Sequence, residues 1–238
     1  MTLLSIIVPS YNEELRLGPT LDEIADYVAG RVGETEVIVV DDGSDDATAE
    51  IAHASSCPNL TVLRTPENRG KGHAVRVGMM EARGDYRLFT DADGSTPIDE
   101  LAALEKALDQ LGGSGVSVAS IGTAGARVTQ AQRGIRPAAG RFGNWLIRII
   151  ALPGVLDSQR GFKLFSEDAA EAIFSRAVID RWAFDVEALA VARHLDFEIV
   201  EVPVTWAHKD DSRVTTLSDL STFIDVLRIR WRLLRGSY

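Results

Sequence analysis

Short apolar runs alternate along the first half of the chain with longer segments whose apolar residues recur at helical spacing. Buried strands are predicted at 5–9, 37–40, 60–63 and 86–90. Helices are expected at 15–28, from 46 onward, at 73–83 and at 96–111. This alternation predicts an α/β fold with a mostly parallel central sheet in a three-layer α/β/α sandwich.

The pattern is less regular after residue 112. Further strands are predicted at 116–121, 161–165 and 198–203, and further helices at 142–152, 185–194 and 217–234. The stretch 122–140 is rich in Gly, Ala and Arg with little periodicity, and it is predicted to be a mobile loop. We expect one domain over 1–238, with parts at 1–111, 112–216 and 217–238.

The composition, 45% hydrophobic and 25% charged, is that of a soluble globular protein. With a net charge of -10 the chain is a poor generic nucleic-acid binder, so no nucleic-acid partner is expected. Cys57 is the only cysteine, which excludes an intramolecular disulfide. The longest apolar stretch, 145–156, is shorter than the roughly 20 residues of a spanning helix, and the start of the chain does not resemble a signal peptide. We therefore expect a cytoplasmic protein, with contact to a membrane surface left open.

Three polar clusters follow predicted strands, where open α/β sheets bind ligands. They are Tyr11-Asn12-Glu13, Asp41-Asp42-Gly43-Ser44 and Asp91-Ala92-Asp93. Two carboxylates at positions i and i+2 can hold a hard divalent cation whose shell a nucleotide diphosphate completes, or they can serve as a helix cap. The carboxylates in the second cluster can accept hydrogen bonds from a base or a ribose, or form an Asx turn before a helix.

Lys71 lies in the glycine-rich segment 68–72. A Walker loop would need a glycine at position 65, where this chain has Thr65, and no G-x-G-x-x-G follows the first strand. The P-loop and dinucleotide interpretations therefore fail. The glycines would instead let the backbone pass close to a ligand, with Lys71 offering a positive charge.

A basic stretch interrupts the acidic chain. Between 123 and 163 the only acid is Asp157, against seven cations: Arg127, Arg133, Arg136, Arg141, Arg148, Arg160 and Lys163. Arginine binds phosphate bidentately, so an anionic second substrate is predicted, with a solvated basic face as the alternative. The last predicted helix contains both apolar residues and arginines. Such a helix can lie on the surface of an anionic bilayer, or it can pack against the core and expose a basic rim.

Four motifs, in order, resemble those of family 2 glycosyltransferases, which have the GT-A (nucleotide-diphospho-sugar transferase) fold: Val8-Pro9-Ser-Tyr11-Asn12-Glu13, Asp41-Asp42-Gly43-Ser44, Asn68-x-Gly70-Lys71-Gly72 and Asp91-Ala92-Asp93-Gly94. In the second half, 157–165, 181–187 and 201–204 resemble dolichyl- or polyprenyl-phosphate β-glucosyltransferases. The resemblance covers nearly the whole chain.

The resemblance implies a donor site in the first half. Asp91 and Asp93 would hold Mg²⁺ or Mn²⁺ against the donor diphosphate. Arg213 matches a mobile loop that can close on the donor. The residues implied to bind the nucleotide sugar are Pro9, Tyr11, Glu13, Asp41, Asp42, Lys71, Asp91, Ala92, Asp93 and Arg213.

The resemblance also implies an acceptor site and a reaction. Arg127 and Arg136 match arginines that hold an acceptor phosphate, with Arg133 as the competing alignment. The implied reaction is metal-dependent, inverting transfer of a hexose, glucose, from a UDP-sugar to polyprenyl phosphate, with Asp93, Arg127 and Arg136 as the catalytic residues. The three parts of the chain then become a nucleotide-sugar half, an acceptor half and an amphipathic helix, attached peripherally to the inner face of the cell membrane.

Departures from the family pattern keep alternatives open. Ser95 stands where related mannosyltransferases often have glutamine, and Arg160 stands where eukaryotic relatives have cysteine. A hydroxyl acceptor would need a base, and the candidates are Asp157, Asp185 and Glu187. GDP-mannose as donor, a nucleotide-sugar-binding regulator without turnover, and an oligomeric state are the other possibilities that the sequence leaves open.

Overall fold

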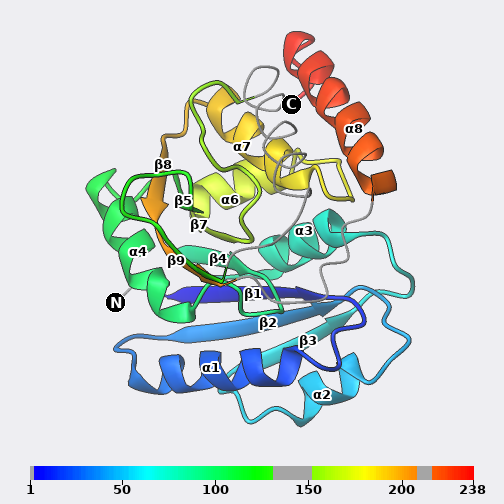
Figure 1. Ribbon diagram of the computed structural model, residues 1–238, viewed down its shortest axis with the longest axis vertical. Coiled ribbons are helices and arrows are strands. Elements are labelled where there is room, and N and C mark those ends of the chain that lie inside the picture. The colour runs from blue at the N-terminus through cyan, green and yellow to red at the C-terminus, as the bar shows by residue number, and fades with distance from the viewer. Residues whose placement is uncertain (1–2, 131–151, 208–215) are drawn as a thin grey trace.

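The computed structural model describes residues 3–130, 152–207 and 216–238, with the backbone alone at residues 130 and 216–223. A central seven-stranded sheet has the order β3-β2-β1-β4-β7-β5-β8 (Figure 1). Its strands are β1 (Leu4–Ser10), β2 (Thr35–Asp41), β3 (Leu60–Arg64), β4 (Tyr86–Thr90), β5 (Val116–Ser120), β7 (Phe162–Ser166) and β8 (Ile199–Pro203). Strand β7 is antiparallel to both neighbours and the other pairings are parallel, which confirms the predicted mostly parallel sheet.

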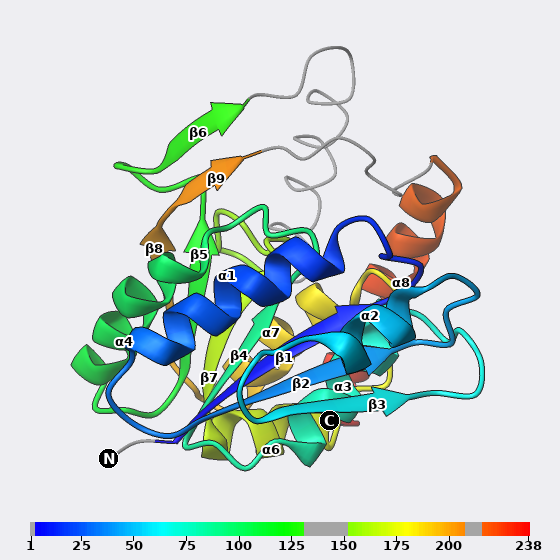
Figure 2. The same cartoon turned by 90° about the horizontal axis from the view of Figure 1, so that it is seen from below.

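Helices cover both faces of the sheet (Figures 1 and 2). One face carries α1 (Leu17–Gly30), α2 (Thr48–Ala54) and α4 (Leu101–Gln110), the last preceded by the 3-10 helix η1 (Ile98–Glu100). The other face carries α3 (Lys71–Glu81), α6 (Glu167–Phe174) and α7 (Phe184–His194), with α8 (Thr216–Leu234) outermost beside α7. The predicted three-layer arrangement is therefore confirmed.

A hydrophobic core lies on each side of the sheet, which explains why the central strands are continuous apolar runs in the sequence. Along β1, Leu4, Ile6 and Val8 point into the core under α1 and α4, and Ile7 points into the core under α3. Neighbouring side chains of a strand face opposite sides of the sheet, so a strand covered on both faces is apolar at every position. Full burial of each such side chain stabilises the fold by about 1.5–3 kcal/mol.

The predictions for the second half need correction. Residues 122–140 are predicted to be a loop, but Arg127–Gln130 forms β6, which pairs in parallel with β9 (Thr205–Ala207) outside the main sheet (Figure 2). These strands have four and three residues, too few to display an alternating pattern. Helix α6 is also absent from the prediction, because its eight residues form little more than two turns. The rest of the predicted loop and residues 142–151 of the predicted apolar helix lie outside the described residues.

In the part of the chain that the structure describes, no helix combines the length and apolar character needed to cross a bilayer.

Candidate active site

The carboxyl ends of β1, β2 and β4 lie side by side and bring the three predicted polar clusters together. In the register of the β1–β2 pair, Ser10 faces Asp41, and the next residue, Asp42, donates its backbone N–H to the Ser10 carbonyl at 2.8 Å. Strand β1 pairs on its other side with β4, which ends directly before Asp91. This edge is where parallel sheets place their ligands.

The Asp91-Ala92-Asp93 segment is held by three hydrogen bonds. The backbone N–H of Asp91 donates to the carbonyl of Gly161 at 2.9 Å, directly before β7. The carbonyl of Ala92 accepts a bond from the hydroxyl of Thr20 in α1 at 2.8 Å. The Asp93 carboxylate accepts the backbone N–H two residues on at 2.9 Å. These bonds fix the segment while leaving both carboxylates partly exposed.

Gly161 gives the Asp91 carboxylate its space. A Cβ atom at this glycine would overlap the Cγ and both oxygens of Asp91. The backbone of Gly161 lies outside the left-handed region, so close approach, and not conformation, is what requires glycine here.

Lys71, at the start of α3, forms an ion pair with Asp91. Its ammonium also lies 5.3 Å from the ring centre of Phe89 and 5.4 Å from that of Trp182. Burial alone would lower the pKa of Lys71, but the neighbouring carboxylates, Asp91 and Asp185 foremost, outweigh it and raise the pKa above its usual value. Lys71 is therefore a fixed cation at the strand ends, within reach of an anionic ligand.

The donor set of Asp91 and Asp93 fits Mg²⁺ or Mn²⁺. Both side chains offer hard oxygen atoms, and Mg²⁺ is typically held by one or two carboxylates together with substrate phosphates. In residues 3–130, 152–207 and 216–238 no group of three or more His, Cys, Asp or Glu residues could hold a metal ion by itself. A diphosphate would therefore have to supply part of the coordination shell.

A second ion pair lies beside the first. Lys163 of β7 pairs with Asp185 of α7, and both side chains are buried. The Lys163 ammonium lies 5.6 Å from the centre of the Phe89 ring, which Lys71 approaches at 5.3 Å. Burial raises the pKa of Asp185, and the two lysines oppose this rise. In the sequence the two residues stand in separate motifs, and nothing in those motifs indicates their pairing.

The other carboxylates considered as bases for a hydroxyl acceptor also have partners. Asp157 accepts the Arg160 guanidinium at 2.8 Å. Glu187 accepts two backbone N–H groups, at 178 and 179, and the hydroxyl of Tyr238 at 2.7 Å. Burial raises the pKa of Glu187 in spite of these bonds. Together with the Asp185 pair, these contacts give each candidate base a structural partner.

Asp41 and Asp42 are both buried and shape the loops around the strand ends. Asp41 accepts the backbone N–H of Ser44 at 3.0 Å, which is the Asx-turn alternative, and pairs with Arg64 at 3.2 Å. The Asp42 carboxylate accepts the backbone N–H groups of 69 and 70, at 3.0 and 2.6 Å. Asp42 thereby holds the glycine-rich segment that leads into Lys71.

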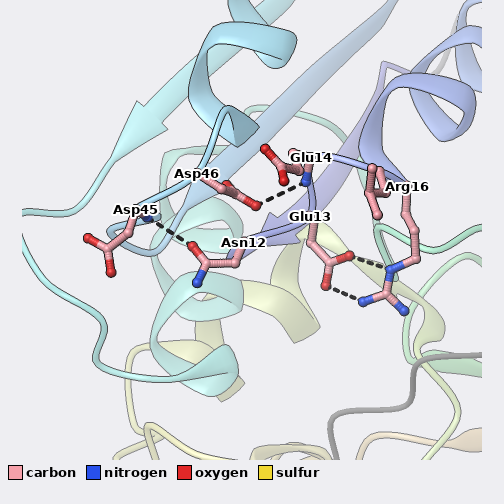
Figure 3. A pocket seen from close by; sticks show the side chains of 7 residues that line it. Asn12, Glu13, Glu14, Arg16, Asp45 and Asp46 are labelled. Carbon is pink, nitrogen blue, oxygen red and sulfur yellow. Dashed lines mark hydrogen bonds and ion pairs between the residues drawn. The ribbon is translucent and has the colours of Figure 1, made fainter.

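A shallow pocket of about 310 Å³ opens beside these loops. It is lined by residues 12–16, Asp45 and Asp46. Figure 3 shows Glu13 turned toward Arg16, which it holds through two bonds of 2.6 and 2.7 Å. The Asn12 side chain accepts the backbone N–H of Asp45 at 2.9 Å, so the loops after β1 and β2 are joined.

Comparison with known proteins identifies the family. The model of the family described as "Glycosyl transferase family 2" matches residues 5–174. The chain belongs to glycosyl transferase family 2. This membership makes the protein an enzyme of the glycosyltransferase class, as the motifs predicted.

The relatives of this family 2 glycosyltransferase include proteins similar over nearly its whole length. It is 37% identical to "Dolichyl-phosphate beta-glucosyltransferase ALG5C" of Trichomonas vaginalis, over 94% of this chain and 70% of the relative. It is 36% identical to the dolichyl-phosphate beta-glucosyltransferase of Homo sapiens, over 99% of this chain and 77% of the relative. The crystal structure of glucosyl-3-phosphoglycerate synthase from Mycobacterium tuberculosis in complex with Mn²⁺ and UDP-glucose aligns with a TM-score of 0.68 and 22% identity, over 96% of this chain and 79% of that one. At this identity the likeness concerns the fold, and it confirms the predicted GT-A architecture.

The structure places several of the residues predicted to bind the nucleotide sugar at one edge of the sheet. Pro9 is buried near the end of β1 and Tyr11 follows that strand, on the edge that also carries Asp41 and Asp91. Arg127 lies exposed at the start of β6. The other arginines predicted to bind the acceptor phosphate, Arg133 and Arg136, lie outside the described residues, and so does Arg213 of the predicted donor loop. The contact of Gly161 with Asp91 and the place of Trp182 beside Lys71 were not predicted, although both residues stand inside motifs that resemble those of the family.

Proposed function

We propose that this family 2 glycosyltransferase transfers glucose from UDP-glucose to a polyprenyl or dolichyl phosphate, with inversion at the anomeric carbon. The chain 1–238 would act as one transferase domain, with Mg²⁺ or Mn²⁺ as cofactor. It would work at the cytoplasmic, inner face of the cell membrane, attached peripherally. The similarity of nearly the whole chain to dolichyl-phosphate beta-glucosyltransferases carries this proposal.

The donor side of the site gives each residue a task in binding. Asp91 and Asp93 would hold the metal, which when bound neutralises charge on the leaving diphosphate. Lys71 would offer a second positive charge to the same diphosphate. The loops joined by Asn12 and Asp42 would surround the nucleoside. Binding in this way fixes the donor for attack from the opposite face of the sugar.

The acceptor side explains why a lipid phosphate suits this site better than a hydroxyl. A phosphate is already anionic near neutral pH and needs no base to activate it. Each of the three carboxylates that could serve as a base already has a partner. Asp185 pairs with Lys163, and Asp157 pairs with Arg160. Glu187 accepts hydrogen bonds from Tyr238 and two backbone amides. Arg127, Arg133 and Arg136 would orient the acceptor phosphate.

A transfer assay tests the proposal. Purified full chain, UDP-[¹⁴C]glucose, Mn²⁺ or Mg²⁺ and a short polyprenyl phosphate would be incubated, and radiolabel in the organic phase would be counted. We expect metal-dependent label in a lipid product, lost in Asp93→Ala. Asp99→Ala, an exposed acid in the following 3-10 helix, is the matched control and should keep the activity.

Two results would argue against the proposed function. Label found only in water-soluble product would move the acceptor to a hydroxyl compound. Metal-dependent UDP-glucose binding without any release of UDP would favour a nucleotide-sugar-binding regulator. Offering GDP-mannose in parallel tests the donor.

A further inference from the structure

Helix α8 has a buried face and an exposed apolar face. Val226 and Ile229 are fully buried against the core under α7. Four large apolar side chains of the same helix are exposed: Ile224 (57%), Leu227 (46%), Trp231 (51%) and Leu234 (71%). At 3.6 residues per turn these four positions fall within an arc of about 80°, nearly opposite the buried pair. We call this set the outward stripe of α8.

Arginines flank the outward stripe on both sides. Arg228 and Arg235 project along one side of it and Arg230 along the other, as the helical spacing requires. All three are exposed, and the Arg235 guanidinium stacks on the Trp231 ring at 4.0 Å. After Asp225 the chain contains no acid, although its net charge is -10. This helix face is therefore positively charged, in contrast to the negative net charge of the whole chain.

Contacts at the end of the helix keep the stripe turned outward. The Tyr238 hydroxyl donates to the buried Glu187 at 2.7 Å, and the Arg232 guanidinium lies 4.8 Å from the Tyr238 ring centre. Arg232 also donates to the carbonyl of Ser237 at 3.0 Å. The bond to Glu187 and the burial of Val226 and Ile229 tie α8 to α7 with the stripe turned outward. Figure 1 shows α8 as the outermost helix on its side of the molecule.

We propose that the outward stripe of α8 docks on an anionic lipid bilayer. Bulky apolar side chains enter the boundary between headgroups and acyl chains, and arginines beside them meet lipid phosphates. The amphipathic ring of tryptophan is favoured at that depth. The positive flanks match an anionic bilayer in charge. This inference extends the proposed function, because a polyprenyl phosphate acceptor lies in a bilayer, but its test does not use sugar transfer.

Vesicle flotation tests the docking surface with the full chain. Phosphatidylcholine vesicles with and without phosphatidylglycerol would be mixed with protein and floated on a density gradient. We expect binding to the anionic vesicles that weakens as salt rises. The double variant Trp231→Ser/Leu234→Ser should reduce the partition coefficient by at least about tenfold, because it removes two bulky side chains from the lipid. Arg228→Gln/Arg230→Gln should reduce it by about 25-fold, fivefold for each arginine.

Val32→Ser is the matched control, since Val32 is an apolar side chain 84% exposed on a loop away from α8. It should float like the parent protein, and circular dichroism should show all variants folded. Unchanged flotation of the stripe variant, or equal loss in Val32→Ser, would overturn the proposal. A parent dimer that the stripe variant converts to monomer, without vesicle binding, would assign the stripe to a second copy of the chain. Sugar transfer to a water-soluble short-chain polyprenyl phosphate does not need a bilayer. If the proposed function is wrong, this transfer fails while vesicle flotation is unaffected.

Discussion

Alanine at Gly161 is expected to displace the Asp91 carboxylate and weaken metal binding. Real Cβ atoms essentially never come within 3.0 Å of a heavy atom outside their own and the neighbouring residues, and a Cβ at Gly161 would overlap three atoms of that carboxylate. The backbone conformation of Gly161 is one that alanine adopts without strain. The perturbation is therefore a single added methyl group whose effect falls on one side chain.

The size of the effect follows from the overlap. The carboxylate must move by about 1 Å or more to restore a normal contact, and a misplacement of 1 Å in an active site can cost about 100-fold in rate. The side chain of Asp91 is 29% exposed and can swing toward water, so the loss of stability should stay near the lower end of the 1–3 kcal/mol typical of overpacking. We expect a large change in function with a small change in stability.

Three measurements separate these effects. Mn²⁺ binding in the presence of UDP, followed by electron paramagnetic resonance, should weaken by at least about tenfold, thermal unfolding should change little, and transfer should fall about 100-fold. Gly30→Ala is the matched control, because nothing lies within 4 Å of a Cβ there and its backbone is not left-handed. In an Asp91→Ala background, Gly161→Ala should have almost no further effect, since the displaced group is gone. Parent-like Mn²⁺ affinity in Gly161→Ala would refute the assignment of Asp91 as a metal ligand in this position.

Three further predictions concern charge and burial. In the absence of nucleotide, the Lys71→Met variant should bind Mn²⁺ about tenfold more tightly than the parent, because no ammonium group pairs with the Asp91 carboxylate. Unchanged Mn²⁺ affinity, measured by electron paramagnetic resonance, would contradict this prediction. Burial alone would raise the pKa of Asp180, but bonds from Arg76 and a half-exposed Arg69 hold it below its usual value. These three residues therefore contribute about 1 kcal/mol of folding stability, which is present above the pKa of the unfolded state and lost as the pH falls through the lowered pKa. Urea unfolding of Asp180→Asn should therefore show a deficit in stability at pH 7 that shrinks as the pH falls through the lowered pKa of Asp180. Burial, with a smaller effect of a nearby acid, raises the pKa of the Cys57 thiol to about 11. Iodoacetamide at pH 8 should therefore label the native protein on the order of 100-fold more slowly than the unfolded protein. Equal labelling rates would refute the buried placement of Cys57.

The first half of the fold was predictable because its strands carry their own signal. The run Val37–Val40 is buried on both faces of the sheet, and such a strand is apolar at each position. The direction of β7 was not predictable, because residues 162–166 look the same in a parallel or an antiparallel strand. Strands β6 and β9 are short and pair across a long stretch of chain, so their pairing is set by tertiary structure alone.

The candidate site was predictable where it follows the sheet edge and unpredictable where it depends on side-chain packing. Parallel strands end on one edge, so Asp41 and Asp91 could be expected near each other. The Lys163–Asp185 pair joins β7 to α7, and no spacing rule links a strand residue to a residue of a later helix. The close approach of Gly161 to Asp91 depends on how two loops pack together, and the sequence indicates it only by a glycine inside a motif.

The ion pairs of the site imply that metal and nucleotide bind together. Lys71 and Lys163 face Asp91 and Asp185, which leaves Asp93 as the unbalanced charge among these five side chains. A dication alone would have to compete with Lys71 for the Asp91 carboxylate, and a diphosphate alone would meet the negative charge of Asp93. With both ligands bound, Lys71 would have a phosphate as partner and Asp91 would have a carboxylate oxygen free for the metal, so each ligand would remove an obstacle to the other. Coupling of this kind is reciprocal, and UDP should strengthen Mn²⁺ binding by the same factor by which Mn²⁺ strengthens UDP binding.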